Sequence, residues 1–117
     1  MDRDGVIALC LAQPGAYLDT PWGDDTVAKV GGKIFCFVGA PTSPPGLTVK
    51  NTPEAVSEWR ARFPEHVHVP RYLKKTLWNR VELDRPDGPD DEDVRELIED
   101  SYRLVVEALP RARRPIS

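Results

Sequence analysis

The sequence is poor in the residue types that build covalently or metal-stabilised folds. Its 117 residues include two cysteines, Cys10 and Cys36, each inside an apolar stretch, and two histidines, His66 and His68. Two cysteines are too few for the disulfide framework of a small secreted domain, so we expect buried, reduced thiols. A structural zinc site needs four convergent ligands, and no CxxC or HxxxH spacing occurs. We therefore expect no bound metal and no cofactor.

The sequence also lacks a long hydrophobic run and a basic N-terminus. Its apolar segments are far shorter than the roughly 20 residues that cross a bilayer as a helix. Asp2 and Asp4 stand where a secretory signal peptide carries basic residues, and Pro14-Gly15 interrupts the segment that follows. These features predict a cytoplasmic protein without a membrane partner.

Motifs that carry catalysis are missing as well. Gly31-Gly32-Lys33 lacks the upstream glycine and the following Ser or Thr of a phosphate-binding loop. There is no GxSxG motif and no cysteine beside a histidine, and the acidic stretch 84–91 lacks the ligand spacing of a calcium loop. We predict no catalytic residues and expect a non-enzymatic protein.

The clearest structural signal is a β-hairpin over Asp25–Val38. Gly31-Gly32 lies between two apolar runs, and a two-residue type I′ turn needs positive φ at both central positions, which glycine adopts without strain. The turn predicts a register that pairs Val30 with Lys33, Ala28 with Phe35 and Val27 with Cys36. The second strand is apolar on both faces, which indicates a central strand.

Other periodicities complete an α+β pattern. Helices are predicted over Arg3–Ala12, between Thr52 and Pro64 and over Asp90–Leu109, strands over Ala16–Asp19, Leu47–Lys50, His66–Pro70 and Leu77–Leu83, and a turn over Thr20–Gly23. Strands bracketed by helices favour an antiparallel sheet with helices packed on one face. The length fits one domain, 1–117, with a basic tail at 110–117.

Charge is distributed unevenly along the chain. The net charge is −3, yet residues 60–80 carry six bases and one acid, whereas 81–107 carry eleven acids and three bases. Polyanion binding depends on the local field, so the basic block matters more than the net charge. Within it, 71–80 interleaves bases with aromatic and hydrogen-bonding side chains, as nucleic-acid surfaces do. The predicted contacts are Arg71, Lys74, Lys75, Trp78, Asn79 and Arg80.

Other interpretations of these residues stay open. Lys74 and Lys75 fit equally well as ordinary solvated residues beside a core Trp78, because an acidic domain is unusual for DNA binding. The basic block and the acidic last helix are also complementary surfaces. They could pair within the chain, between two copies in a homodimer, or with another protein.

Several short motifs follow one another along the chain in an order and spacing typical of one protein family. They are Gln13-Pro14-Gly15-Ala16, Pro21–Thr26, Lys29–Phe35, Leu47–Lys50 with Pro53-Glu54, Lys75 with Trp78-Asn79, and Ser101–Val105. In this order and spacing the chain resembles the MmcQ/YjbR family from Val6 to Arg111. The resemblance implies a fold like that of the bacterial frataxin homologue (CyaY) and DNA binding through a double-wing arrangement of hairpins. Lys33, Lys75, Trp78 and Asn79 match the family pattern, with Lys33 at a hairpin tip as a second wing.

The chain departs from the family pattern near the basic segment. The family usually has Asn, Lys, a basic residue, His and Trp in succession, whereas Lys74, Thr76 and Leu77 replace the Asn, the basic residue and the His here. Chemistry that depends on that Asn or His would be lost, while Lys74 preserves the charge. The frataxin-like fold also suggests weak metal binding by an acidic first helix, but that helix carries only Asp2 and Asp4.

Overall fold

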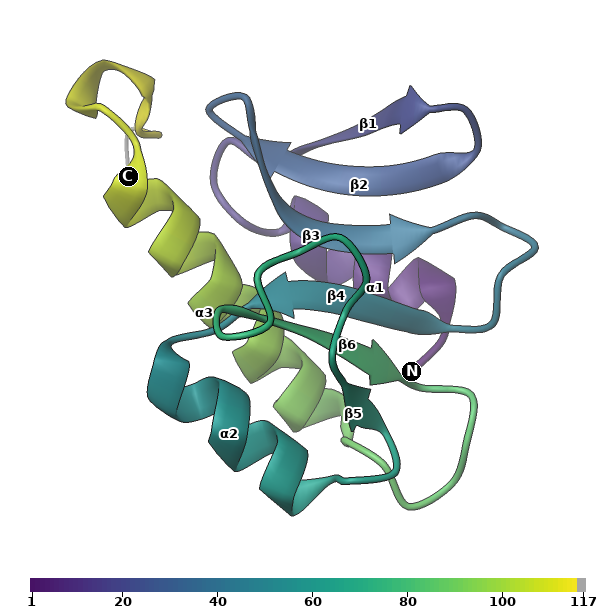
Figure 1. The fold of residues 1–117 in the computed structure, drawn as a ribbon. Coiled ribbons are helices and arrows are strands. Elements are labelled where there is room, and N and C mark those ends of the chain that lie inside the picture. Colours follow the sequence, from purple (N-terminus) through teal and green to yellow (C-terminus); the bar gives the residue numbers. More distant parts are fainter. Residues whose placement is uncertain (116–117) are drawn as a thin grey trace.

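A six-stranded antiparallel sheet dominates the computed structural model, which describes residues 1–115 (Figure 1). The strand order is β1-β2-β3-β4-β6-β5. The elements in chain order are α1 (Arg3–Leu11), β1 (Tyr17–Trp22), β2 (Asp25–Val30), β3 (Lys33–Gly39), β4 (Gly46–Lys50), α2 (Pro53–Arg62), β5 (Val67–His68), β6 (Trp78–Glu82) and α3 (Asp91–Ala108), followed by a 3-10 turn at Arg111–Arg113.

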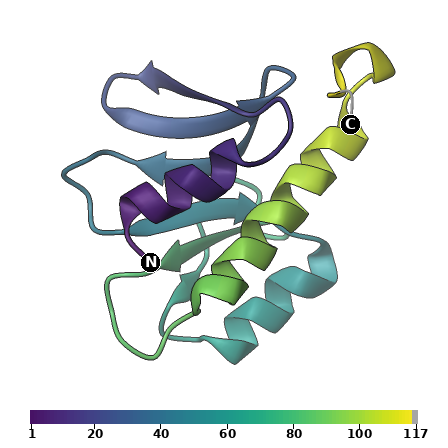
Figure 2. The same cartoon turned by 180° about the vertical axis from the view of Figure 1, so that it is seen from behind.

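The helices lie on one side of this sheet. α1 and α3 cross the face seen in Figure 2, and α2 packs at the end of the sheet formed by β5 and β6. Val6 and Cys10 of α1 and Leu97 and Ile98 of α3 are fully buried against Phe35 and its neighbours. Both cysteines are free and buried, as predicted. The predicted α+β fold, with an antiparallel sheet and helices on one face, is confirmed.

Each helix begins at a residue whose side chain accepts a hydrogen bond from the first turn. The Asp2 carboxylate accepts from the Gly5 amide at 2.9 Å, and the Thr52 hydroxyl caps α2 in the same way. Asp90 and Asp93 form a reciprocal capping box at the start of α3. Such caps satisfy amides that have no partner inside the helix, which explains why the sequence marks these starts well. No helix among residues 1–115 is long and apolar enough to cross a bilayer.

The β2–β3 turn forms as the sequence predicts. Gly31 and Gly32 have φ values of +57° and +83°, and Val30 pairs with Lys33 across the turn. A Cβ atom on Gly31 would lie 2.6 Å from a methyl group of Leu109, whereas a Cβ on Gly32 would meet nothing within 4 Å. The first glycine is therefore required by packing as well as by backbone conformation.

The register predicted beyond the turn is wrong, because a β-bulge interrupts the ladder. Ala28 pairs with Cys36 and not Phe35, and Val27 pairs with Phe37 and not Cys36. The extra residue lets both Phe35 and Cys36 enter the core, where each is fully buried. Since both faces of β3 are apolar, alternation alone could not fix the register. The bulge turns Phe37 toward the face of the sheet without helices.

The first strand is longer than predicted. The expected turn at Thr20–Gly23 is wrong, because β1 continues through Pro21 to Trp22 and the chain reverses at Gly23-Asp24. Proline is tolerated here because β1 is an edge strand, so no ladder partner needs its missing amide hydrogen. The extension places Trp22 beside Phe37.

The other predicted elements agree with the structure to within a few residues, except that the predicted strand His66–Pro70 shrinks to Val67–His68. In the predicted basic tail, residues 116–117 lie outside the described part of the chain. Before them, the Arg114 guanidinium donates to the carbonyls of Leu109 at 3.0 Å and Glu107 at 2.9 Å, which ties this segment to the end of α3.

Candidate functional site

The face of the sheet opposite α1 and α3 is partly covered by the segment between β5 and β6. Figure 1 shows this segment, residues 69–77, passing in front of β3 and β4. It leaves a cleft of about 850 Å³ between itself and the sheet. The cleft brings together residues from β1, β2, β3, β4, β6 and the segment, including Trp22, Asp25, Phe37, Arg71, Tyr72 and Arg80.

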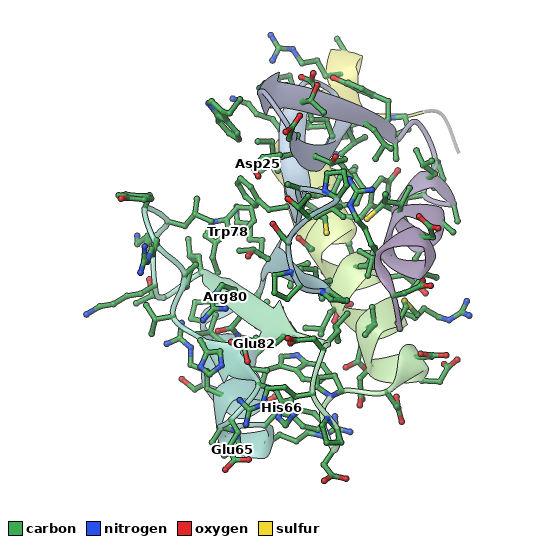
Figure 3. The ribbon with its side chains drawn as sticks, turned by 90° about the vertical axis from the view of Figure 1, so that its right-hand side faces the viewer. Asp25, Glu65, His66, Trp78, Arg80 and Glu82 are labelled. Atoms are coloured by element: carbon green, nitrogen blue, oxygen red, sulfur yellow. The ribbon has the colours of Figure 1, made fainter. Side chains whose placement is uncertain are left out.

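A row of aromatic rings crosses this open face. Trp22 stacks on Phe37 with ring centroids 6.4 Å apart and planes 8° apart, and Phe37 meets the Trp78 ring edge to face at 5.7 Å. Figure 3 shows Trp78 and Arg80 on the side of the sheet away from α1. Trp22 remains 62% exposed at the end of the row. Sequence reasoning missed Trp22 because it expected a turn there, although Gly23-Asp24 was an available turn signal.

The covering segment presents one aromatic side chain entirely to solvent. Tyr72 is 100% exposed and has a φ of +63°, in the left-handed region that tyrosine rarely adopts. An exposed ring contributes nothing to the core, and the backbone conformation costs about 1–3 kcal/mol. Sequence reasoning did not single out this tyrosine, because backbone strain has no signature in composition.

Arg60 of α2 holds the C-terminal part of the basic segment 71–80 in place. Its guanidinium donates to the side-chain oxygen of Asn79 at 2.7 Å and to the backbone carbonyls of Lys75 at 2.7 Å and Trp78 at 3.2 Å. These bonds anchor the start of β6 and the residues before it to α2. Arg60 belongs to the basic block, but its Nε and Nη2 atoms donate within the chain, so its role is positioning.

Arg62 is also engaged within the chain. It pairs with Asp93 of α3 at 3.0 Å and lies over the Trp59 ring at 5.2 Å. This contact is one link between the basic block and the acidic last helix inside a single chain. No ion pair among residues 1–115 joins Arg71, Lys74 or Lys75 to that helix.

Asn79 points to the helix side of the sheet, as its alternation with Trp78 and Arg80 predicts. Its side chain has no exposed surface. The amide nitrogen donates to the side-chain oxygen of Asn51 at 2.9 Å and to the carbonyl of Val56 at 3.2 Å, while its oxygen accepts from Arg60. The structure therefore separates Asn79 from Trp78 and Arg80, which face the open side, and from the segment above that face. Lys33 lies apart from both, at the β2–β3 turn.

The remaining bases of the predicted patch are exposed. Arg71, Lys74 and Lys75 stand on the segment without an ion-pair partner in the described part of the chain. Lys33 is exposed at the β2–β3 turn, which the strand register places at the same end of the sheet as the start of β6. Lys50, opposite Trp78 at the end of β4, is a further base at this end that sequence reasoning missed.

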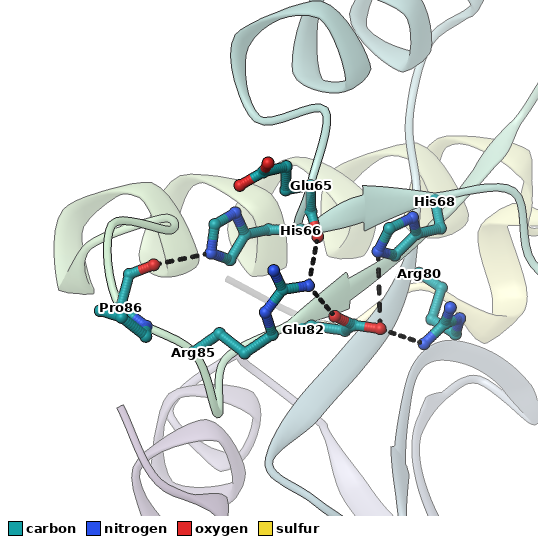
Figure 4. A network of polar contacts seen from close by, with 7 residues as sticks. All are labelled: Glu65, His66, His68, Arg80, Glu82, Arg85 and Pro86. Carbon is teal, nitrogen blue, oxygen red and sulfur yellow. Dashed lines mark hydrogen bonds and ion pairs between the residues drawn. The ribbon is translucent and has the colours of Figure 1, made fainter.

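Arg80 is partly neutralised by a carboxylate at its side. The Glu82 carboxylate lies 3.1 Å from Nη1 of Arg80, 3.5 Å from Nε2 of His68 and 3.5 Å from Nη1 of Arg85 (Figure 4). Partial burial acts to raise the pKa of Glu82, but the hydrogen bond from Arg80 and the charges of His68 and Arg80 outweigh it, so the pKa lies below its usual value. Glu82 therefore stays ionised at neutral pH and orders the cations around it.

Metal ligands do not converge in the described structure. Among residues 1–115 there is no group of three or more His, Cys, Asp or Glu side chains arranged to hold a metal ion. The acidic first turn of α3, Asp91–Asp93, lies on the helix side of the sheet, across from the open face (Figure 2).

Known structures share this arrangement. The chain is similar to the Deinococcus radiodurans protein DR2400, with a TM-score of 0.82 and 27% identity over 94% of this chain and 83% of that one. A Pseudomonas syringae protein shares the fold, with a TM-score of 0.71 and 22% identity over 89% of this chain and 98% of that one. A comparison with curated proteins gives no match. The YjbR family model matches residues 11–104, most of the chain, and the protein therefore belongs to the YjbR family.

Proposed function

We propose that the protein is a nucleic-acid-binding domain that contacts DNA, or another polyanion, through the segment 71–80 on the open face of its sheet. The observation that carries the proposal is the set of three exposed bases, Arg71, Lys74 and Lys75, on a segment that crosses an aromatic row. Bases without intramolecular partners are free to release the counterions of phosphates, which is the main source of non-specific affinity.

The contact residues divide by role. Lys74 and Lys75 neutralise phosphates, Arg71 does so at the rim of the cleft, and Lys33 with Lys50 extends the positive surface at the same end of the sheet. Arg80 contributes less to the positive field because its ion pair with Glu82 partly neutralises its charge. Trp78 supports the aromatic row from within the face, while buried Asn79 acts only through the fold.

The net charge of −3 does not oppose this function, because α3 carries a large share of the acids, while the open face carries Asp25 and Glu82 beside its bases. The acidic start of α3 lies behind the sheet, so a polyanion at the open face meets bases first. Exposed charges separated by more than a Debye length of about 10 Å at 0.1 M salt are largely screened from each other. The local field at the segment therefore governs binding.

Pairing between copies of the chain is the competing proposal, and the placement of the charges disfavours it. The basic segment and the acidic helix occupy opposite faces of the sheet, so their contact would be head-to-tail. Head-to-tail contacts produce open chains unless the rotation closes a ring, and not the two-fold dimer that is most common. Light scattering at low and high salt separates the two proposals, because open chains would grow with concentration at low salt.

Fluorescence anisotropy with labelled single-stranded and duplex DNA tests the proposed function. The wild type should bind at low salt and weaken steeply toward physiological salt, because each duplex phosphate contact contributes about 0.9 to the log–log salt slope. The variant Lys74→Ala/Lys75→Ala should bind more weakly, with a slope smaller by roughly 1.4 to 1.8 for two lost contacts.

The matched control removes two positive charges elsewhere. Arg95→Ala/Arg103→Ala changes the net charge equally but on α3, where both arginines are about half exposed. It should bind like the wild type. Equal weakening in both double variants would mean that only net charge matters, and absence of binding at low salt would remove the proposed function.

A further inference from the structure

The cleft above the sheet has the chemistry of a site for a flat, uncharged ring. The sheet contributes Trp22, which stacks on Phe37, and the covering segment contributes Tyr72 to the lining of the same cleft. Both rim aromatics are largely exposed, Trp22 at 62% and Tyr72 at 100%. Exposed aromatic rings from both the sheet and the covering segment offer stacking surfaces to a planar ligand in the cleft.

The backbone at Tyr72 supports a role in binding. Its φ of +63° places the ring at the rim at a conformational cost, and no packing in the core offsets that cost. Glycine or asparagine would satisfy the same conformation with less strain. A tyrosine at this position therefore supplies an exposed aromatic ring at the cost of backbone strain.

Charge within the cleft is close to balanced. Arg71 and Arg80 contribute guanidinium groups, but Asp25 contributes a carboxylate, and Arg80 already pairs with Glu82. A phosphate inside the cleft, beside Asp25, would gain less than one at the rim beside Arg71, since the Asp25 carboxylate repels it. A nucleobase is uncharged, stacks on aromatic rings and can donate its amino hydrogens to a carboxylate. The exposed lysines that suit phosphates lie outside the cleft, on the same segment.

We infer that the cleft binds an unpaired nucleobase, with Tyr72 and Trp22 as its stacking surfaces, so that the protein prefers single-stranded nucleic acid to duplex. The inference rests on the proposed function, because the backbone of the same strand would lie along Lys74 and Lys75. In a duplex the base faces are stacked on their neighbours, and exposing one costs free energy. Single strands present their bases without that cost.

The test uses three labelled oligonucleotides of equal length. They are a single strand of thymidine nucleotides, a single strand of abasic units with the same phosphates, and a duplex. Anisotropy is measured with the full chain and with Tyr72→Ala, Tyr72→Phe and Trp22→Ala. Tyr17→Ala is the matched control, because Tyr17 is a 44% exposed tyrosine of β1 that does not line the cleft.

The thymidine strand should bind more tightly than the abasic strand by roughly 5- to 150-fold, the range for one base stacked on an aromatic side chain. Tyr72→Ala should remove most of that difference, while Tyr72→Phe and Tyr17→Ala should keep it. Because Tyr72 is fully exposed, Tyr72→Ala tests binding without loss of core packing, whereas Trp22→Ala also removes a stacked ring.

The outcomes separate the two proposals. Equal affinity for the thymidine and abasic strands, with steep salt dependence and loss in Lys74→Ala/Lys75→Ala, would overturn the base-binding cleft and leave the phosphate-binding segment standing. Unchanged base preference in both Tyr72→Ala and Trp22→Ala would also overturn it. Failure of every oligonucleotide to bind at low salt would remove both proposals.

Discussion

Replacement of Asn79 by alanine should cost much of the stability of the fold while leaving ligand contacts at the open face in place. The Asn79 side chain makes two neutral hydrogen bonds, to Asn51 and to the Val56 carbonyl, and accepts one from the charged Arg60 guanidinium. Neutral bonds contribute about 0.5–1.5 kcal/mol each and a charged one about 1.5–3 kcal/mol. The expected loss is therefore about 3–5 kcal/mol, since the partners remain buried without Asn79.

Urea unfolding followed by tryptophan fluorescence and circular dichroism measures this loss. Domains of this size have about 5–15 kcal/mol of stability, so Asn79→Ala should remain folded but with a clearly lower midpoint. Asn51→Ala breaks only one of the three bonds and should cost about 1–2 kcal/mol. The two changes should not add, because they remove the same hydrogen bond.

A loss below about 1 kcal/mol in Asn79→Ala would refute the buried network as a source of stability. A loss of DNA affinity with unchanged stability would mean that Asn79 acts at the surface. Either result would contradict its complete burial beneath α2. DNA affinity per folded molecule should instead stay close to that of the wild type, apart from effects of the looser segment.

The remaining predictions concern the turn, a charge cluster, a helix cap and the strained tyrosine. Gly31→Ala should destabilise more than Gly32→Ala in thermal melts, because only the first Cβ would collide, at 2.6 Å, and equal effects would argue against that packing. Glu82 has a folded pKa below its ordinary 4.5, so its stabilising contribution is present above that value and is lost as the pH falls through the folded pKa. Glu82→Gln should thus differ from wild type at pH 7 and converge with it in acid. Asp90→Ala removes the capping box and should lower the free energy of unfolding, measured in urea, by about 0.5–2 kcal/mol. An unchanged free energy of unfolding would mean that the capping box does not form. Tyr72→Gly should melt at or above the wild-type temperature, and a marked drop would contradict the strain at this residue.

Local signals in the sequence were sufficient for most of the secondary structure. Gly31-Gly32 defined a turn because few other residues adopt positive φ, and Thr52-Pro53 and Asp90 began helices because their side chains satisfy free amides. The alternation over 77–83 assigned Asn79 and Arg80 to opposite faces of the sheet. Each of these features depends on a few neighbouring residues, which a sequence contains in full.

The charge of the basic block was also visible in the sequence, but its division by role was not. Arg60 and Arg62 belong to the same run of bases as Lys74 and Lys75, yet contacts with Asn79 and Asp93 engage the two arginines inside the chain. Only the fold brings α2 beneath the start of β6, so no local pattern could separate positioning arginines from exposed lysines.

The sequence by itself determined the α+β class, the turn, the helix starts and the presence of a basic segment, because short-range backbone preferences and composition govern them. Tertiary structure decided the register of β3, the length of β1 and the cleft. The bulge at Phe35 forms because the core accepts two consecutive apolar residues, and β1 passes through Pro21 because it lies at a sheet edge. These two adjustments place Phe37 and Trp22 side by side under the basic segment, an arrangement that depends on contacts between residues far apart in the chain.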